Sequence, residues 1–196
     1  MKIIRCTWVN QDQQCIKYHD EEWGVPVYED RKLLEYLILE AAQAGLNWFT
    51  ILKKREAYRK VYSSFDPVAV AKYDENKKAE LLSNSGIIRN KLKIESSISN
   101  AKAFLAIQKE YGSFKNYIWS FVNNMPIQND FKSIEYVPSK TVLSDRISKD
   151  LKKRGFKFVG STIIYAFMQA VGMVNDHLVG CFRYKELNAV PSKEGI

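Results

Sequence analysis

The sequence predicts an all-helical protein with no independent second domain, on three observations. Apolar residues recur three and four positions apart, capping residues stand before these runs, and glycines follow several of them. No run alternates between apolar and polar residues as a half-buried strand does. A chain of 196 residues, 46% of them hydrophobic, can bury one core. We expect one domain over residues 1–185 and a frayed tail over residues 186–196.

The first expected helices each begin at a residue that caps helix N-termini. They run from Asp30 to Gly45, from Asn47 through Tyr58, from Asp66, which precedes Pro67, and from Asp74 to near Gly86. The apolar residues that define the first two are Leu33, Leu34, Leu37, Ile38 and Ala41, and then Trp48, Ile51 and Leu52. These stripes predict helices that pack one face against a core.

The later helices are ended by glycine. A helix from about Asn90 to Glu110 stops at the Tyr-Gly pair 111–112, and Ser113 opens the run SFKNYIWSFV. Residues 123–140 contain two prolines and predict a loop. Two final helices are expected over Ser144–Arg154, before Gly155, and over Ser161–Ala170, before Gly172.

Composition narrows the class of protein and its partners. No run of about eighteen apolar residues predicts a membrane span, and the N-terminus MKIIRCTWVNQDQQ turns polar too early for a signal peptide. Three cysteines without paired spacing argue against a secreted disulfide framework, so we expect a cytoplasmic protein. The net charge is +8, and residues 139–160 hold seven basic and two acidic side chains. This clustering fits a polyanion partner as well as a solvated surface.

Both histidines and two of the three cysteines form two pairs. Cys6 and His19 have twelve residues between them, and His177 and Cys181 have three, which is about one helical turn. A Cys2His2 set satisfies tetrahedral zinc and leaves no open position for water, so such a zinc would be structural. It would join the N-terminal and C-terminal segments. The alternative is a satisfied histidine and a buried thiol at each end.

Glu40 stands on the apolar face of its expected helix. Seven residues after Leu33, it lies about 20° from that residue around the helix axis. An unpaired carboxylate is costly to bury, so a core salt bridge is the simplest explanation. Aromatic residues are close in sequence, however, with Tyr18 and Trp23 before Glu40 and Trp48 after it. A carboxylate among aromatic rings also suits a flat cationic ligand.

The stretch LKKRGFKFVGSTIIYAFMQA, residues 151–170, predicts two helices joined by a short hairpin between Gly155 and Gly160. The free amides at the start of the second helix would bind an anion, and lysine and arginine flank them. Such a hairpin grips DNA phosphates without reading bases. An ordinary helical hairpin with solvated lysines is the alternative.

Several motifs together resemble the DNA-3-methyladenine glycosylase I family. They are CTWV, YHDEEWGVP, LILEAAQAGLNWFTILKKREAY, GIIRNKLKI and LKKRGFKFVGSTIIYAFMQAVGMVNDHLVGC, in matching order from about Cys6 to Cys181. The resemblance implies a helix-hairpin-helix DNA glycosylase fold. It also implies base-excision repair by hydrolysis of the N-glycosidic bond of 3-methyladenine in alkylated double-stranded DNA.

The resemblance also implies roles for particular residues. It implies a structural zinc held by Cys6, His19, His177 and Cys181, and a base pocket formed by Glu40, Tyr18 and Trp48, with Glu40 as the catalytic residue. The DNA-gripping hairpin falls on Lys157, Phe158, Val159 and Gly160. No lysine stands out as a Schiff-base nucleophile, so we expect no strand cleavage, and we expect a monomer.

Three points stay open at the level of sequence. Cys15 stands where the family usually has a second tyrosine, and it is either part of an altered pocket or an inert buried thiol. Asp176 lies sixteen residues after Gly160, where many relatives in the wider superfamily have a catalytic aspartate, but it also adjoins His177 and suits a supporting role. A DNA-binding module without activity and a zinc hydrolase are the rival functions.

Overall fold

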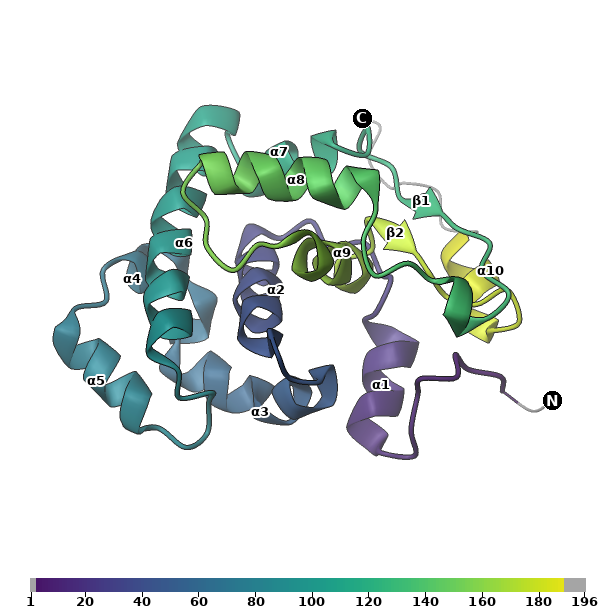
Figure 1. Cartoon of the computed structure of the whole chain (residues 1–196), viewed down its shortest axis with the longest axis horizontal. Helices are drawn as coiled ribbons and strands as arrows, with labels where there is room; N and C mark the ends of the chain where they lie inside the picture. The colour runs from purple at the N-terminus through teal and green to yellow at the C-terminus, as the bar shows by residue number, and fades with distance from the viewer. Residues whose placement is uncertain (1–2, 189–196) are drawn as a thin grey trace.

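The computed structural model describes residues 3–188 and shows a helical protein (Figure 1). Its α-helices are α1 (Gln13–Glu21), α2 (Asp30–Gln43), α3 (Trp48–Val61), α4 (Pro67–Ala71), α5 (Glu75–Ser83), α6 (Lys91–Tyr111), α7 (Phe114–Ser120), α8 (Val142–Lys153), α9 (Ser161–Ala170) and α10 (Phe182–Asn188). Two 3-10 turns, η1 (Ser63–Phe65) and η2 (Ile134–Tyr136), and a parallel pair of strands, β1 (Ile127–Gln128) and β2 (Val174–Asn175), complete it. The all-helical prediction is confirmed, with this small sheet added.

Side-chain caps explain where most helices begin. Five residues at which a helix was expected to begin each accept a hydrogen bond from a backbone N–H in the following helix: Asn47, Asp66, Asp74, Asn90 and Ser113. A cap of this kind contributes about 1 kcal/mol to stability. These helix starts are therefore encoded locally, which is why the sequence predicts them.

Two predicted starts differ from the structure. The Asp30 side chain does not cap α2; it accepts hydrogen bonds from the Gln108 side chain and from the backbone N–H groups of Phe114 and Lys115. Helix α8 begins at Val142 instead of Ser144, because Thr141 caps it and Ser144 completes a reciprocal capping box.

Helices α1 and α10 and the strand pair were not predicted. Helix α1 buries only Cys15, Tyr18 and His19, so its apolar stripe is too short to stand out. Each strand has two residues, which is too short to alternate. The expected tail begins inside α10, which ends at Asn188, and residues 189–196 lie outside the described residues.

Helix α2 lies in the middle of the protein and packs against α3, α6, α7 and α9 (Figure 1). Its residues Leu33, Leu34 and Leu39 are fully buried, and each contributes about 1.5–3 kcal/mol through removal of apolar surface from water. Helices α8 and α9 pack side by side and are joined by the hairpin. This packing places the last turns of α2 beside α9 and near the start of α3.

The two ends of the described chain meet on one side of the protein (Figure 1). The Phe182 N–H donates to the Ile4 carbonyl at 3.0 Å. Nearby, Gly172 has φ +71°, and a Cβ there would lie 2.4 Å from the Val25 carbonyl carbon, so this close approach requires glycine. Over residues 3–188, no helix has the length and apolar character that crossing a membrane requires.

Candidate metal and base-binding sites

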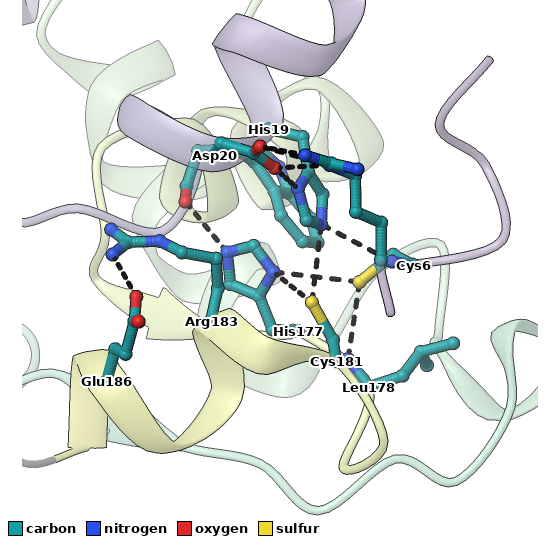
Figure 2. A network of polar contacts seen from close by, with 10 residues as sticks. Cys6, His19, Asp20, His177, Leu178, Cys181, Arg183 and Glu186 are labelled. Carbon is teal, nitrogen blue, oxygen red and sulfur yellow. Dashed lines mark hydrogen bonds and ion pairs between the residues drawn. The ribbon is translucent and has the colours of Figure 1, made fainter. Parts of the chain in front are cut away.

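Cys6, His19, His177 and Cys181 come together where the two ends of the chain meet (Figure 2). All four are buried, and their ligand atoms lie within 4.8 Å of one another. His177 Nδ1 is 3.6 Å from the Sγ atoms of both cysteines, and His19 Nε2 is 3.5 Å from Cys181 Sγ. The sequence pairs therefore converge on one group, as the four-ligand hypothesis requires.

The distances in this group fit a bound ion. A tetrahedral ion with bonds of about 2.3 Å to sulfur and about 2.0–2.1 Å to nitrogen places a sulfur and a nitrogen ligand about 3.5–3.6 Å apart, as in the three contacts above. A hydrogen bond with the Cys6 thiol, supported by hydrogen bonds with His177 and His19, lowers the pKa of the Cys181 thiol. These contacts outweigh burial, which by itself would raise this pKa. Ionised sulfur is the form that binds metals. The group can therefore hold a metal ion.

Neighbouring groups orient both imidazoles toward the two sulfurs. His19 Nδ1 is 2.7 Å from Asp20 Oδ1, and His177 Nε2 is 3.0 Å from the Trp23 carbonyl oxygen. Burial opposes ionisation of Asp20, but hydrogen bonds from Arg5 and His19 outweigh it and lower the pKa of this carboxyl. Each histidine thus uses its outer nitrogen as a donor, which leaves the inner nitrogen as a ligand.

A pocket of about 350 Å³ lies next to this group. It is formed by four helices, α1, α2, α3 and α9, together with the N-terminal segment and the loop around η2. The residues that line it are Trp8, Tyr18, Trp23, Glu40, Gln43, Trp48, Ile134, Val137, Pro138, Ala166 and Gln169. The rings of Tyr18 and Trp48 have centroids 5.2 Å apart and are tilted by 45°. The structure therefore brings together the three residues predicted for a base pocket. The pocket they line has the size and aromatic lining of a ligand site.

Glu40 lies inside this pocket without a protein partner. Glu40 is 3% exposed, and its carboxyl group makes no hydrogen bond or ion pair within residues 3–188. Burial raises its pKa to about 8. The core salt bridge considered from the sequence is therefore absent, and Glu35, which stands on the same helix, makes one instead with Arg59 at 2.7 Å.

Trp48 also carries an unused polar group. Its Nε1–H is buried and has no hydrogen-bond partner within the described chain. A buried donor without an acceptor costs about 1–3 kcal/mol. A residue that lines the pocket thus carries an unpaired donor, and the pocket itself holds the unpaired Glu40 carboxyl group, which is open to a ligand.

The hairpin residues differ in what they expose. Lys157 is exposed and Phe158 partly so, whereas the Val159 side chain is 1% exposed and packs in the core. The loop is held by Asn100, whose side chain pairs with both the N–H and the carbonyl of Lys157, and by Ser148, which donates to the Val159 carbonyl. No side chain caps α9 at Gly160. Its first amides are therefore available to an anion.

The methyladenine glycosylase family model matches residues 8–184 of this chain, which is most of its length. The chain belongs to the methyladenine glycosylase family. This confirms the resemblance seen in the sequence motifs, and the metal-binding group, pocket and hairpin described above are features of a member of this family.

Relatives and solved structures agree with this assignment. DNA-3-methyladenine glycosylase 1 of Escherichia coli (strain K12) is 51% identical over 180 residues, which are 92% of this chain and 96% of that protein. A crystal structure of 3-methyladenine DNA glycosylase I has a TM-score of 0.89 at 52% identity and covers 91% of this chain and 98% of that one. The 3-methyladenine DNA glycosylase I of Staphylococcus aureus, solved to explain 3-methyladenine recognition, has a TM-score of 0.88 at 34% identity, covering 90% and 94%. The predicted glycosylase fold is confirmed.

Sequence reasoning missed part of the methyladenine glycosylase pocket. Trp8 and Gln169 line it, although neither was among the predicted site residues. For Trp8 a signal was available, since it stands two residues after the ligand Cys6 and its ring contacts that of His19 at 5.3 Å. Cys15 is 6% exposed and is not among the pocket-lining residues. Its place in the structure therefore fits the buried thiol considered from the sequence.

Proposed function

We propose that this chain hydrolyses the N-glycosidic bond of 3-methyladenine in alkylated double-stranded DNA and leaves the strand intact. The observation that carries this proposal is the unpaired Glu40 carboxyl group inside an aromatic pocket of a methyladenine glycosylase. The relatives named 3-methyladenine DNA glycosylase I support the choice of base.

The bond to be broken is weakened by the lesion. Methylation at N3 makes the adenine cationic, so the base leaves C1′ with the electron pair of the bond and becomes neutral. Water adds to C1′ and its proton passes to solvent. The protein has to extrude the base, hold it and let water reach the sugar.

Tyr18 and Trp48 bind the flat cationic ring in this proposal. Both residues line the pocket, and their ring centroids are 5.2 Å apart. Attraction between the cation and an aromatic face contributes about 1–2 kcal/mol at a desolvated site. Normal adenine is neutral, stacked and paired, so it gains less from the pocket and costs more to extrude.

Glu40 is the proposed catalytic residue because it contacts the base. Its carboxylate accepts hydrogen bonds from the amino edge of the base, in a charge-assisted contact that is stronger than a neutral one. Since burial alone raises its pKa to about 8, a cation in the pocket favours loss of the carboxyl proton. Ionisation of Glu40 and binding of a cationic base therefore support each other, which disfavours neutral bases.

The hairpin binds the DNA backbone in this proposal. Lys157 and the free amides after Gly160 face phosphates, with Phe158 beside them, while the buried Val159 contributes only its backbone. The net charge of +8 adds attraction to any DNA sequence. One chain carries both the hairpin and the pocket, so the monomer suffices.

We further propose that the ion held by Cys6, His19, His177 and Cys181 is zinc. Two thiolates and two imidazoles are a preferred ligand set for this metal in structural sites. When bound it stabilises the fold by joining the two ends of the chain, and four protein ligands leave no position for a reacting water. The ion therefore has no step in base removal.

Release of free base tests the function. Methylated duplex DNA is incubated with the protein, the released bases are separated, and the strands are examined for breaks. Free 3-methyladenine with intact strands is expected. DNA binding without base release would favour the binding-only module, and broken strands would contradict the monofunctional mechanism.

A further inference from the structure

Asp176 is buried close to the base pocket, and both of its carboxylate oxygens are engaged. Oδ1 accepts a hydrogen bond from Asn129 Nδ2 at 2.7 Å. Oδ2 accepts from the Tyr165 hydroxyl at 2.7 Å and from Gln169 Nε2 at 2.8 Å. Burial, and then Asp176 itself, raise the pKa of Tyr165, so this hydroxyl keeps its proton and donates. Asp176 therefore acts as an acceptor in every contact.

The bond to Asp176 fixes the orientation of the Gln169 side-chain amide. A carboxylate can only accept, so the Gln169 nitrogen must face Asp176 and the amide oxygen must turn away from it. The backbone of Gln169 is held as well, because its carbonyl accepts from the Gly24 N–H at 3.0 Å. Gln169 is therefore oriented before any ligand arrives.

Gln169 lines the same pocket as Glu40 and Trp48. Its Oε1 has no hydrogen-bond partner among the residues the structure describes, so this oxygen is available to a ligand. The pocket then holds two free acceptors, the Glu40 carboxylate and the Gln169 amide oxygen. Gln43 also lines the pocket, but no contact fixes which end of its amide faces inward.

We propose that Gln169 is a base-recognition residue and that Asp176 is the positioning residue that aims its oxygen into the pocket. This assignment rests on the proposed function. Two acceptors match a purine edge that carries an amino group, as in 3-methyladenine. In 3-methylguanine a carbonyl oxygen replaces the amino group at C6, so an acceptor that faces this position finds no donor there. Gln169 therefore contributes to selectivity for methylated adenine over methylated guanine.

Binding of the free bases tests the proposal apart from catalysis. The pocket contains Trp8, Trp23 and Trp48, so tryptophan fluorescence reports titration with free 3-methyladenine or 3-methylguanine. Gln169→Met keeps the length of the side chain and removes the acceptor. We expect its Kd for 3-methyladenine to rise about tenfold, since one hydrogen bond is lost, and its preference over 3-methylguanine to narrow by a similar factor.

A matched control is available in Gln128→Met. Gln128 is also partly buried and accepts a hydrogen bond from Asn175 at 2.8 Å, next to Asp176, but it does not line the pocket. This variant should keep the wild-type Kd values. Loss of affinity in both variants, with the two bases weakened equally, would assign the effect to general loosening and overturn the proposal.

Asp176→Leu tests the positioning step. Leucine has a similar size but offers no acceptor, so the Gln169 nitrogen is no longer held at residue 176 and the amide oxygen is no longer fixed toward the pocket. We expect weaker binding of 3-methyladenine and a narrower preference over 3-methylguanine, with Gln128→Met unchanged. Should this variant fail to fold, Gln169→Met still decides the question.

The outcomes separate this inference from the proposed function. If the wild-type protein releases 3-methyladenine from DNA and Gln169→Met binds both free bases with wild-type affinity, the role of Gln169 is refuted and the function stands. If the wild type releases no base, the function fails, and because the role of Gln169 rests on it, that role falls with it.

Discussion

The metal-binding group and the base pocket are neighbours built on opposite principles. In the metal-binding group the polar atoms are paired. Asp20 and the Trp23 carbonyl accept hydrogen bonds from His19 Nδ1 and His177 Nε2, and the four ligand atoms lie within 4.8 Å of one another. Among residues 3–188, by contrast, the Glu40 carboxyl in the pocket has no partner, and neither has the buried N–H of Trp48, a residue that lines the pocket. Satisfied groups stabilise the fold, and unsatisfied groups lower stability until a ligand arrives.

The metal-binding group and the base pocket nevertheless depend on each other. Trp8 and Trp23 line the pocket, and their rings contact those of His19 and His177 at 4.7–6.3 Å. Tyr18, another pocket residue, directly precedes His19 in α1. The metal-binding group therefore also fixes the aromatic walls of the pocket, and the stability it provides offsets the cost of the unpaired groups.

Removal of a metal ligand should give the largest effect. Cys181→Ser should prevent binding of the proposed zinc and lower the free energy of unfolding by about 5 kcal/mol or more, which approaches the total stability of a domain. Chemical denaturation and metal content measure this. Cys15→Ser is the matched control, because Cys15 is equally buried but is not a ligand. Wild-type protein that contains no metal when purified would contradict the prediction.

Loss of the pocket carboxylate should mainly affect activity. Glu40→Gln should lower kcat/KM for release of 3-methyladenine by about 100-fold, because a charge-assisted hydrogen bond of about 2–3 kcal/mol is lost. The control is Glu35→Gln on the same helix, which breaks the ion pair with Arg59 outside the pocket. That variant should lose stability and keep its activity. Equal activity of wild type and Glu40→Gln would remove Glu40 from the mechanism.

The stability of Glu40→Gln should change in the opposite direction to that of Cys181→Ser. The folded protein holds the Glu40 proton up to a pKa of about 8, whereas the unfolded chain releases it near the ordinary value of 4.5. The native state thus binds more protons between these values, and stability falls as pH rises through them. Denaturation at pH 9 should therefore show Glu40→Gln more stable than wild type by about 4–5 kcal/mol, because each unit between the two pKa values is worth about 1.4 kcal/mol. At pH 5 this advantage should have largely disappeared, and a constant difference would contradict the pKa assignment.

The sequence predicts features that are encoded locally and misses those that depend on distant neighbours. Asn47 and Asp74 cap helices through residues next to them, so their helix starts could be predicted. The ligand pairs were visible, but only the fold shows that His19 meets Cys181. Gln169 could not be predicted as a site residue, because its orientation is set by Asp176 and its surroundings by three other helices.

The pH dependence of kcat/KM tests the central claim most directly, since this parameter reports ionisations of the free enzyme. In the proposed mechanism, ionised Glu40 binds a cationic base, and burial raises the pKa of Glu40 to about 8. For wild type, kcat/KM for release of 3-methyladenine should rise from pH 6, reach half of its maximum near pH 8 and level off above about pH 9, whereas Glu40→Gln should be flat over this range. A flat wild-type profile, or the same rise in both proteins, would contradict the account.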